Sequence, residues 1–507
     1  MKVFQFILGD KVWISYFKKC MLISLVLHVL AAIYSIGFHH FDEHFQILEL
    51  LNLKLDGNTI KSLTWEFDVG MRPWLQSWIL YVMTKGMLLV GIESPFIHTL
   101  FFRLLSSLIG WFSLVLVGFL SYRWVCVYKL KEKWARYIIW PLILCWFYPY
   151  IHARVSSDNW GAVFFTIAFC LVLLFYPQNA KLEDNELRPF KGERYSIPAW
   201  VVFIAGIVFG FSFQFRYQMG ICIFFFYLWC LIYGRMKISS GLIMTFALIL
   251  SLCIGLLVDG WGYGKFTFSA WNYFFYDVIE GIPGKTIANP WYDYFRLALL
   301  RGIPPISLVL MLGTIVFWWK FKSHPLTWIT LPFFLVHNVF LHKELRYIFI
   351  LVLLSPIMTT LAIQFFGIHK FQNKFWKAGF YLILFCNTIL LFVSIMKPAN
   401  VAPAFYSHIN KKNIKTVYYK GENPFTILGL KLNYYNPQHP EINKMESYPQ
   451  KNFKGWYVTT RGRDFFHMEK DVLHCKLDYI TYPKWTFAFN VFHWVEKSRI
   501  WALFKCE

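Results

Sequence analysis

Long apolar runs separated by short polar connections repeat along the first four fifths of the chain. Apolar runs near 20 residues match the length that a helix needs to cross a bilayer. About 110 mostly polar residues follow the last run. The pattern predicts about eleven membrane-spanning helices, over residues 20–37, 96–120, 137–152, 160–176, 198–215, 219–234, 238–258, 299–319, 326–341, 345–366 and 378–396.

Two stretches do not fit the spanning pattern. The apolar run Trp74–Val90 contains Gln76 and Lys85, so we expect an amphipathic helix that lies in the membrane interface. Residues 397–507 alternate apolar and polar positions in short runs between turn residues. The sequence therefore predicts an α-helical multi-pass module over residues 1–396 and a small extracytoplasmic α/β domain over residues 397–507.

Composition and charge agree with a membrane protein. Hydrophobic residues make up 57% of the 507 residues, which is more than a soluble protein of this size buries, and the net charge is +22. A nucleic-acid partner is not expected, because the cations are densest in short connections, as membrane orientation signals are. These are the N-terminal tail and residues 121–136, 177–197, 235–237, 320–322 and 367–377.

This charge distribution predicts a cytoplasmic N-terminus and an extracytoplasmic C-terminus, in the endoplasmic reticulum lumen or the bacterial periplasm. All unusual polar clusters then lie on the extracytoplasmic side, so we expect them to share one site. They are Phe38–Gln46, Thr64–Arg72, Arg154–Asn159, Phe215–Gln218, Asp259–Arg301 and His342–Arg346.

The first cluster places two acids, Asp42 and Glu43, just after the first apolar run. Carboxylates beside a membrane helix are costly to hold there and are usually functional. A carboxylate at this boundary is able to take the proton of an acceptor hydroxyl during sugar transfer. The alternative is that the pair caps the following helix, where early acids favour the positive helix end.

The last cluster, His342–Arg346, places three potential cations at the start of a helix. Cations at this end oppose the helix dipole but suit a phosphate, and Glu344 would hold one of them by pairing. The alternative is a basic anchor that reaches toward lipid headgroups. We expect His342, Lys343 and Arg346 to bind phosphate. Arg216 and Arg72 are further candidates, with interfacial anchoring as their alternative, and Arg154 is expected to pair with Asp158.

The segment between residues 261 and 295 is unusually aromatic for a loop. Aromatic faces with scattered amides suit sugar rings or prenyl chains, and they also suit interfacial packing. We assign substrate binding to Trp271, Asn272 and Trp291, together with Trp65 and Glu66. The chain has no DxD metal motif, P-loop or GxGxxG motif in these clusters, so neither a metal nor a nucleotide cofactor is expected.

The ten cysteines follow no metal or redox spacing. Eight of them lie in or beside apolar segments, where cysteine behaves as a small hydrophobe. Cys475 and Cys506 lie in the polar C-terminal part and are able to pair if it faces an oxidising compartment. Their pairing stays open at this point.

Four motifs occur in an order that resembles glycosyltransferase family 22: HFDEHFQ, TWEFDVGMRPW, VDGWGYGKFTFSAWNYFFYDVIEG with NPWYDYF, and FLHKELRYIF. The resemblance covers roughly residues 20–370. It implies a GT-C fold, a polyprenyl- or dolichyl-phosphate-mannose donor and metal-independent, inverting transfer. It also implies a catalytic acid in the first extracytoplasmic loop. By position this is Asp42 or Glu43, with His342, Lys343 and Arg346 near the donor phosphate.

Two departures from the family pattern concern the acceptor more than the donor. Phe41 stands where the family usually has proline, and Met71-Arg72-Pro73 replaces the common IRS segment. The resulting hypothesis is a membrane mannosyltransferase that acts on a glycan or glycolipid hydroxyl among membrane lipids. The alternatives are a lipid or glycolipid flippase, with polar groups on both membrane faces, and a non-catalytic subunit of a glycosylation complex.

Overall fold

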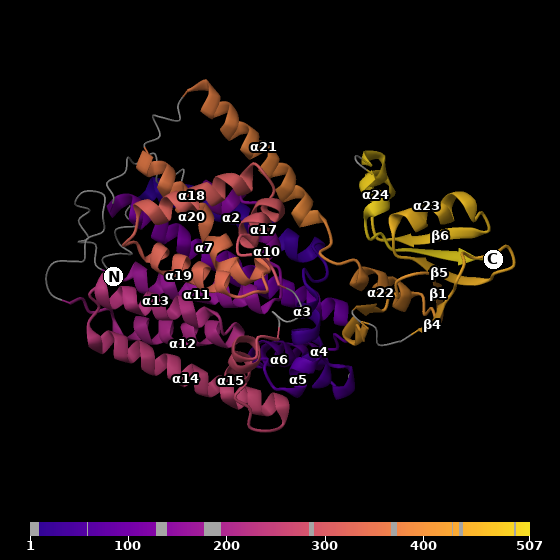
Figure 1. Ribbon diagram of the computed structural model, residues 1–507, viewed down its shortest axis with the longest axis horizontal. Coiled ribbons are helices and arrows are strands. Elements are labelled where there is room, and N and C mark those ends of the chain that lie inside the picture. Colours follow the sequence, from indigo (N-terminus) through magenta and orange to yellow (C-terminus); the bar gives the residue numbers. More distant parts are fainter. Residues whose placement is uncertain are drawn as a thin grey trace. The chain divides into compact units, whose positions relative to one another are not determined.

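The computed structural model of the chain shows helices over most of its length and a small sheet near the C-terminus (Figure 1). Its description covers residues 10–57, 59–127, 139–176, 194–282, 288–366, 373–427, 429–435, 440–490 and 493–507. The predicted cytoplasmic segments 121–136, 177–197 and 367–377 lie largely outside the described residues. Contacts divide the chain into two units.

The first unit contains residues 1–33, 68–76 and 103–396 and is a helical bundle. Its helices are α2 (Lys11–Tyr34), α7 (Pro95–Val127), α9 (Trp140–Leu144), α10 (Phe147–His152), α11 (Ser157–Leu174), α12 (Ala199–Phe215), α13 (Met219–Ile232), α14 (Ile238–Tyr263), α15 (Ser269–Phe274), η3 (Phe275–Ile279), α17 (Asp293–Gly302), α18 (Ile306–Lys320), α19 (Pro325–Val339), η4 (Leu345–Ile348), α20 (Phe349–Phe366) and α21 (Lys374–Met396).

Helices α12 and α14 lie side by side, and small residues explain how closely they approach (Figure 1). A Cβ at Gly206 would lie 2.3 Å from the carbonyl oxygen of Met244, and one at Gly210 would collide with Ser251. Glycines four residues apart on one helix face allow two backbones to come together in a membrane bundle. Helix α11 packs against α12.

All eleven predicted apolar runs contain helix. By length and composition, six of the described helices are able to cross a membrane, or up to seven if the bent pair α18–α19 is one span. Two shorter apolar helices are α12 and α13. The α-helical multi-pass class is therefore confirmed.

Two predicted spans are not continuous helices. The run 299–319 is interrupted at Ile303–Pro305, where two prolines follow a residue with φ of 61°. The run 137–152 is divided between α9 and α10 among the described residues. Helices α18 and α19 also meet at 114°, so a short connection turns the chain sharply.

The second unit contains residues 34–67, 77–102 and 397–507. Its first part includes α3 (Phe41–Glu43), η1 (His44–Leu48), α4 (Glu49–Leu53), η2 (Ile60–Ser62), α5 (Trp65–Asp68) and α6 (Leu75–Leu89). Helix α6 occupies the run predicted to lie in the membrane interface, and Leu89 and Val90 at its end are largely exposed. Its place in a bilayer stays a prediction.

The C-terminal part of this unit is a small α/β domain, as expected. It contains α22 (Ala402–Lys411), β1 (Thr416–Tyr419), β2 (Thr426–Ile427), β3 (Leu430–Lys431), η6 (Asn433–Tyr435), β4 (Glu441–Lys444), β5 (Gly455–Thr459), α23 (Gly462–Asp471), β6 (Cys475–Ile480), η7 (Lys484–Phe489), α24 (Trp494–Lys497) and β7 (Ala502–Cys506). The sheet order is β4-β1-β5-β7-β6, with β1 parallel to β4 and β5, and β7 antiparallel to β5 and β6.

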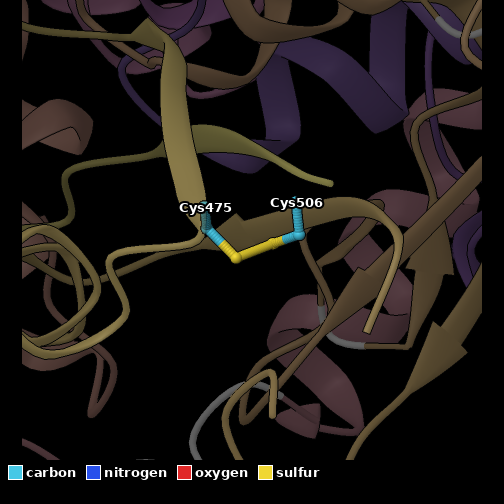
Figure 2. Close-up of a disulfide and its surroundings, with 2 residues drawn as sticks. All are labelled: Cys475 and Cys506. Atoms are coloured by element: carbon cyan, nitrogen blue, oxygen red, sulfur yellow. A yellow bond between two sulfur atoms is a disulfide. The ribbon is translucent and has the colours of Figure 1, made fainter. Parts of the chain in front are cut away.

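A disulfide joins Cys475 of β6 to Cys506 of β7 (Figure 2). The two residues lie directly opposite each other in the antiparallel pair, 31 positions apart in sequence. The bond links the edge strand β6 to β7. Both cysteines belong to a buried core that includes Tyr457, Phe465 and Phe504. The pairing that the sequence left open is therefore present.

Candidate active site

The acid-bearing segment belongs to the second unit, and its two carboxylates have different surroundings. His40 is the N-cap of α3, and its ring nitrogen accepts from the Asp42 amide. The Glu43 carboxylate accepts from the backbone amides of His39 at 3.0 Å and His40 at 3.4 Å, which completes a capping box. Glu43 is buried, whereas the Asp42 side chain is 17% exposed and lies 3.4 Å from His40 Nδ1.

A buried histidine–carboxylate pair follows these acids. His44 Nε2 lies 2.6 Å from Glu49 Oε1, which also accepts from the Tyr434 amide at 3.0 Å. Both side chains of the pair are completely buried. Because Tyr434 lies in η6, Glu49 attaches the C-terminal domain to the segment that bears Asp42 and Glu43.

Glu66 contacts the same segment. Gln46 Nε2 donates to both Glu66 oxygens, at 3.0 and 3.3 Å. Glu66 thus holds two sequence motifs together, and its predicted substrate binding stays untested. The neighbouring Trp65 is 46% exposed, so its ring surface remains open to a ligand.

Arg72 belongs to the first unit, where its backbone is fixed from two sides. The Tyr263 hydroxyl donates to the Arg72 carbonyl at 2.8 Å and accepts from its amide at 3.1 Å. Asn272 donates to the carbonyls of Val69 and Gly70 at 3.0 and 3.2 Å. The Asn272 amide nitrogen, assigned to substrate binding from sequence, therefore supports the turn before Arg72. The Arg72 guanidinium lies 5.6 Å from the centre of the Tyr273 ring.

Asp259 connects three of the sequence motifs and was not among the predicted site residues. It accepts from the Trp74 amide at 2.8 Å and from the Ser269 hydroxyl. Ser269 in turn lies 2.7 Å from the Tyr217 hydroxyl. The carboxylate therefore aligns the chain around Arg72 with the turn that carries Arg216.

Arg216 and Arg346 are brought together by Asp158. Arg216 Nε lies 3.0 Å from Asp158 Oδ1, and Arg346 Nη1 lies 3.4 Å from Oδ2. All three side chains are buried. The expectation that Asp158 pairs with Arg154 is wrong: the start of α11 directs Asp158 to the two distant arginines, while Arg154 donates to the Tyr150 carbonyl.

Tyrosine rings complete this cation cluster of Arg72, Arg216 and Arg346. The Arg216 and Arg346 guanidinium carbons lie 5.1 and 4.9 Å from the centre of the Tyr347 ring. Gln218 accepts from Arg216 Nε and donates to the Tyr273 hydroxyl, both at 2.9 Å. Tyr273 and Tyr347 thus give the guanidinium groups flat faces to stack on.

The cationic side chains of the His342–Arg346 segment have different surroundings. Glu344 accepts from Arg346 Nε and lies 2.9 Å from His342 Nε2, so it holds both. Lys343 is buried, and its Nζ donates to the carbonyls of Phe340 at 2.6 Å and Asn289 at 3.5 Å. Burial lowers the pKa of Lys343, and the Asp293 carboxylate partly offsets this effect.

Asn289 attaches the NPWYDYF segment to the His342–Arg346 segment. The backbone amide of Asn289 donates to the Leu341 carbonyl at 2.8 Å, and its side-chain oxygen accepts from the backbone amide of Lys343 at 3.0 Å. Asn289 Nδ2 also donates to Asp293 at 2.8 Å. The hydrogen bond from Arg296 holds the pKa of Asp293 below its ordinary value. The neighbouring Trp291 is largely exposed, as is Trp271.

The cation cluster suits an anionic ligand. Three guanidinium groups gather here, and Asp158 and Glu344 hold two of them in fixed positions. Buried or half-buried guanidinium groups bind phosphate through charge-assisted hydrogen bonds. Similarity to known proteins identifies the family of this chain.

Residues 19–439 match the model of the Alg9-like mannosyltransferase family. The chain belongs to this family. The match ends just after Tyr434 and Tyr435, so it includes both the acid-bearing segment and the η6 segment that Glu49 binds. Membership in a family of membrane mannosyltransferases also establishes the chain as an integral membrane protein, in agreement with its apolar helices.

Two curated relatives are GPI mannosyltransferases. GPI alpha-1,2-mannosyltransferase 3 of Danio rerio is 20% identical over 372 residues, which cover 72% of this chain and 60% of the relative. GPI mannosyltransferase 3 of Candida albicans is 26% identical over 351 residues, which cover 68% of this chain and 63% of the relative. The chain thus spans about three fifths of the length of these family members.

A solved structure shares the fold. The crystal structure of ArnT from Cupriavidus metallidurans bound to undecaprenyl phosphate aligns with a TM-score of 0.51 at 12% identity. The alignment covers 97% of this chain and 98% of ArnT. The GT-C-type fold expected from the family resemblance is confirmed.

Within this Alg9-like protein, the structure gathers the predicted Arg72, Arg216 and Arg346 in one unit. It adds Asp158, Asp259 and Asn289, which sequence reasoning did not assign to the site. Asp158 was visible as an acid at the start of an apolar run, but its partners lie far away in sequence. Glu49 lies five residues after His44, the spacing of the π-helical turn η1, which a search at helical period 3.6 does not consider.

Proposed function

We propose that the protein is a membrane mannosyltransferase that moves mannose from a polyprenyl- or dolichyl-phosphate-mannose donor to a hydroxyl of a glycan or glycolipid. The observation that supports it best is the buried cation cluster, which suits the phosphate of such a donor. Family membership supports the transferred sugar. The match gives no support to a flippase.

The proposed reaction has one bond-forming and one bond-breaking event at the sugar. A carboxylate takes the proton of the acceptor hydroxyl, and the hydroxyl oxygen forms a bond to the anomeric carbon of mannose. The bond from that carbon to the phosphate oxygen breaks, and its electron pair leaves with the phosphate. The sugar is transferred with inversion. No metal is required in this proposal, because cationic side chains stabilise the leaving phosphate.

Arg346, Arg216 and Arg72 are the proposed ligands of the leaving phosphate, with Lys343 and His342 beside them. Fixed positive charge at a developing anion lowers the barrier most when it needs no rearrangement during the reaction. Asp158, Glu344 and the tyrosine rings provide this rigidity, because each guanidinium already has a fixed neighbour.

Asp42 is the proposed base, and Glu43 is the proposed support for it. Glu43 is buried and its Oε1 accepts from the backbone amides of His39 and His40, so this carboxylate serves as a helix cap. Asp42 keeps an exposed edge and lies on the same short helix. Trp65, Trp271 and Trp291 remain proposed contacts for the sugar or the lipid chain.

The acceptor and its side of the membrane are also proposals. The names of the relatives support a glycolipid hydroxyl as the acceptor. The disulfide supports an oxidising, extracytoplasmic location of the C-terminal domain, because such bonds persist there. The same location follows from the charge of the predicted cytoplasmic segments.

The test is incubation of the purified protein with polyprenyl-phosphate-mannose and candidate glycolipids, followed by mass spectrometry of the products. We expect a mannosylated glycolipid from the wild type and a rate about 10²–10⁴-fold lower from Asp42→Asn, the range that a general base contributes. Glu43→Gln should lower the rate less. Full activity in both variants would remove these acids from the mechanism.

A further inference from the structure

Among the buried polar atoms that have no hydrogen-bond partner within the described residues, two belong to side chains that the proposed mechanism does not use. They are the hydroxyl of Tyr294 and Nε2 of His337. The Tyr294 side chain is 1% exposed and that of His337 is 2% exposed. A buried polar atom without a partner costs free energy, so such atoms in a native protein call for an explanation. A bound ligand would supply the missing hydrogen bonds.

Tyr294 lies beside the cluster at the start of α17. Its ring packs against Phe334, with ring centres 6.2 Å apart. Burial raises the pKa of Tyr294, and the charges of Arg216, Glu344 and Asp158 also act on its phenol. These are the residues that surround Tyr347 and the proposed phosphate site. Because the phenol remains protonated, its unpaired hydroxyl is available as a hydrogen-bond donor.

His337 approaches the same cluster from α19. Its Nδ1 lies 2.8 Å from the carbonyl oxygen of Phe333, and a carbonyl only accepts, so Nδ1 carries the hydrogen. In the neutral imidazole, Nε2 is then left with a lone pair and is a hydrogen-bond acceptor. The His337 ring lies 6.3 Å from that of Phe340, measured between ring centres, and the Phe340 carbonyl accepts from Lys343. The unpaired nitrogen therefore needs a ligand group that donates.

The Tyr294 hydroxyl requires a hydrogen-bond acceptor, whereas His337 Nε2 requires a donor. The two side chains therefore bind different chemical groups of a ligand. An ionised phosphodiester has only acceptor oxygens, so it satisfies a hydroxyl donor and cannot satisfy a lone pair. On the head group of a polyprenyl-phosphate sugar, the only donors are the hydroxyls of the sugar. A single donor molecule whose phosphate and sugar both lie at the cluster would satisfy both groups at once.

We propose that Tyr294 donates a hydrogen bond to the phosphate of the lipid donor and that His337 accepts one from a hydroxyl of its sugar. The inference rests on the proposed function and adds two binding residues to it. Tyr294 contributes to affinity for any polyprenyl phosphate. His337 contributes to recognition of the sugar and therefore to the discrimination between a glycosylated donor and the product that has lost its sugar.

The experiment measures binding of two probes to the full-length protein in nanodiscs: polyprenyl-phosphate-mannose and polyprenyl phosphate. We expect Tyr294→Phe, which removes only the hydroxyl, to weaken both probes about tenfold, as a hydrogen bond to a charged group does. We expect His337→Asn to weaken the mannose-bearing probe about fivefold or more and to leave polyprenyl phosphate unchanged. Asparagine keeps a donor near the position of Nδ1 and removes the acceptor at Nε2.

Two further variants are controls. His337→Gln places an amide oxygen near the position of Nε2 and should restore part of the lost affinity for the mannose-bearing probe. Tyr227 of α13 also has a buried hydroxyl without a partner among the described residues, but its ring packs against the apolar core of the bundle. Tyr227→Phe should therefore bind both probes as the wild type does.

The outcomes separate this inference from the proposed function. If the wild type binds the donor and transfers mannose while Tyr294→Phe and His337→Asn bind as it does, the inference is overturned and the function stands. Equal weakening of both probes by His337→Asn overturns the assignment of this residue to the sugar. If the wild type binds neither probe and transfers nothing, the function fails and the inference fails with it.

Discussion

At the scale of single residues, Asp158 explains how two guanidinium groups remain close together inside the protein. Arg216 and Arg346 repel each other, and taking them out of water costs free energy. Each faces one oxygen of Asp158, and Glu344 adds a second carboxylate on the side of Arg346. The two carboxylates therefore lower the cost of burying the two guanidinium groups side by side.

Removal of this carboxylate should therefore destabilise the protein as well as the site. We expect Asp158→Asn to lower the free energy of unfolding by about 3–5 kcal/mol, the range for breaking a buried ion pair. Thermal unfolding in detergent measures this as a lower Tm. Asp471→Asn removes an exposed carboxylate and should change stability by less than about 1 kcal/mol. An unchanged Tm in Asp158→Asn would show that the two arginines do not depend on it.

At the scale of secondary-structure elements, the loop before α17 sets the position of the His342–Arg346 segment. Asn289 forms hydrogen bonds with Leu341 and Lys343, and Asp293 binds Asn289 from the first turn of α17. The segment that follows α19 is therefore held by backbone hydrogen bonds and is not a free loop. The helix break at Ile303–Pro305 ends α17 shortly after this loop.

This coupling predicts a pH effect on activity. Burial lowers the pKa of Lys343 below the ordinary 10.5, so the protonated form, which is the one proposed to bind phosphate, is lost as the pH rises through this lowered value. Asp293 raises the pKa of Lys343, and its removal should lower that pKa further. We expect Asp293→Asn to move the alkaline limb of the kcat/KM profile to lower pH.

The control for this prediction is Arg296→Gln. It breaks the exposed ion pair on Asp293 but keeps the carboxylate charge that faces Lys343. Its alkaline limb should stay close to that of the wild type. Identical limbs in the wild type and Asp293→Asn would mean that Lys343 does not control activity in this pH range.

At the scale of the whole molecule, the second unit joins parts of the chain that are far apart in sequence. The backbone amide of Tyr434 donates to Glu49, and the amides of Ala399 and Asn400 donate to the carbonyl of Ile36. The acid-bearing segment and the C-terminal domain are therefore one structural unit. The disulfide links the edge strand β6 of this domain to its neighbour β7 (Figure 2).

Loss of the disulfide should destabilise the C-terminal domain. The bond closes a loop of 31 positions, for which chain entropy suggests roughly 3–4 kcal/mol. We expect Cys475→Ser to lower the urea concentration at which protease cleaves this domain in the full-length protein. Cys253→Ser, which replaces an exposed free cysteine of α14, is the matched control. If both variants were cleaved at the same urea concentration, the disulfide would not contribute to the stability of the sheet.

The predicted orientation is tested in sealed membrane vesicles. We expect an added protease to remove the C-terminal domain when the extracytoplasmic side faces outward and to leave it intact in inverted vesicles. Vesicles opened with detergent provide the control for protease activity in both preparations. Cleavage in the inverted vesicles alone would reverse the topology and place the acid-bearing segment, which belongs to the same unit, on the cytoplasmic side.

The sequence by itself determined the membrane class, the helical runs and the residue types of the site. Apolar length and period are local properties, so each of the eleven runs was found, as was the small C-terminal α/β domain. The polar clusters also predicted Asp42, Arg72, Arg216 and Arg346 as site residues, because charged groups are conspicuous next to apolar runs.

Only the tertiary structure decided how these groups are paired. Asp158 meets Arg346 across 188 positions, and Asn289 meets Lys343 across 54. It also distinguished Glu43, a helix cap, from Asp42, and it joined Cys475 to Cys506. Such contacts depend on the packing of helices and strands that are distant along the chain, and no local pattern encodes which of several acids a given arginine will face.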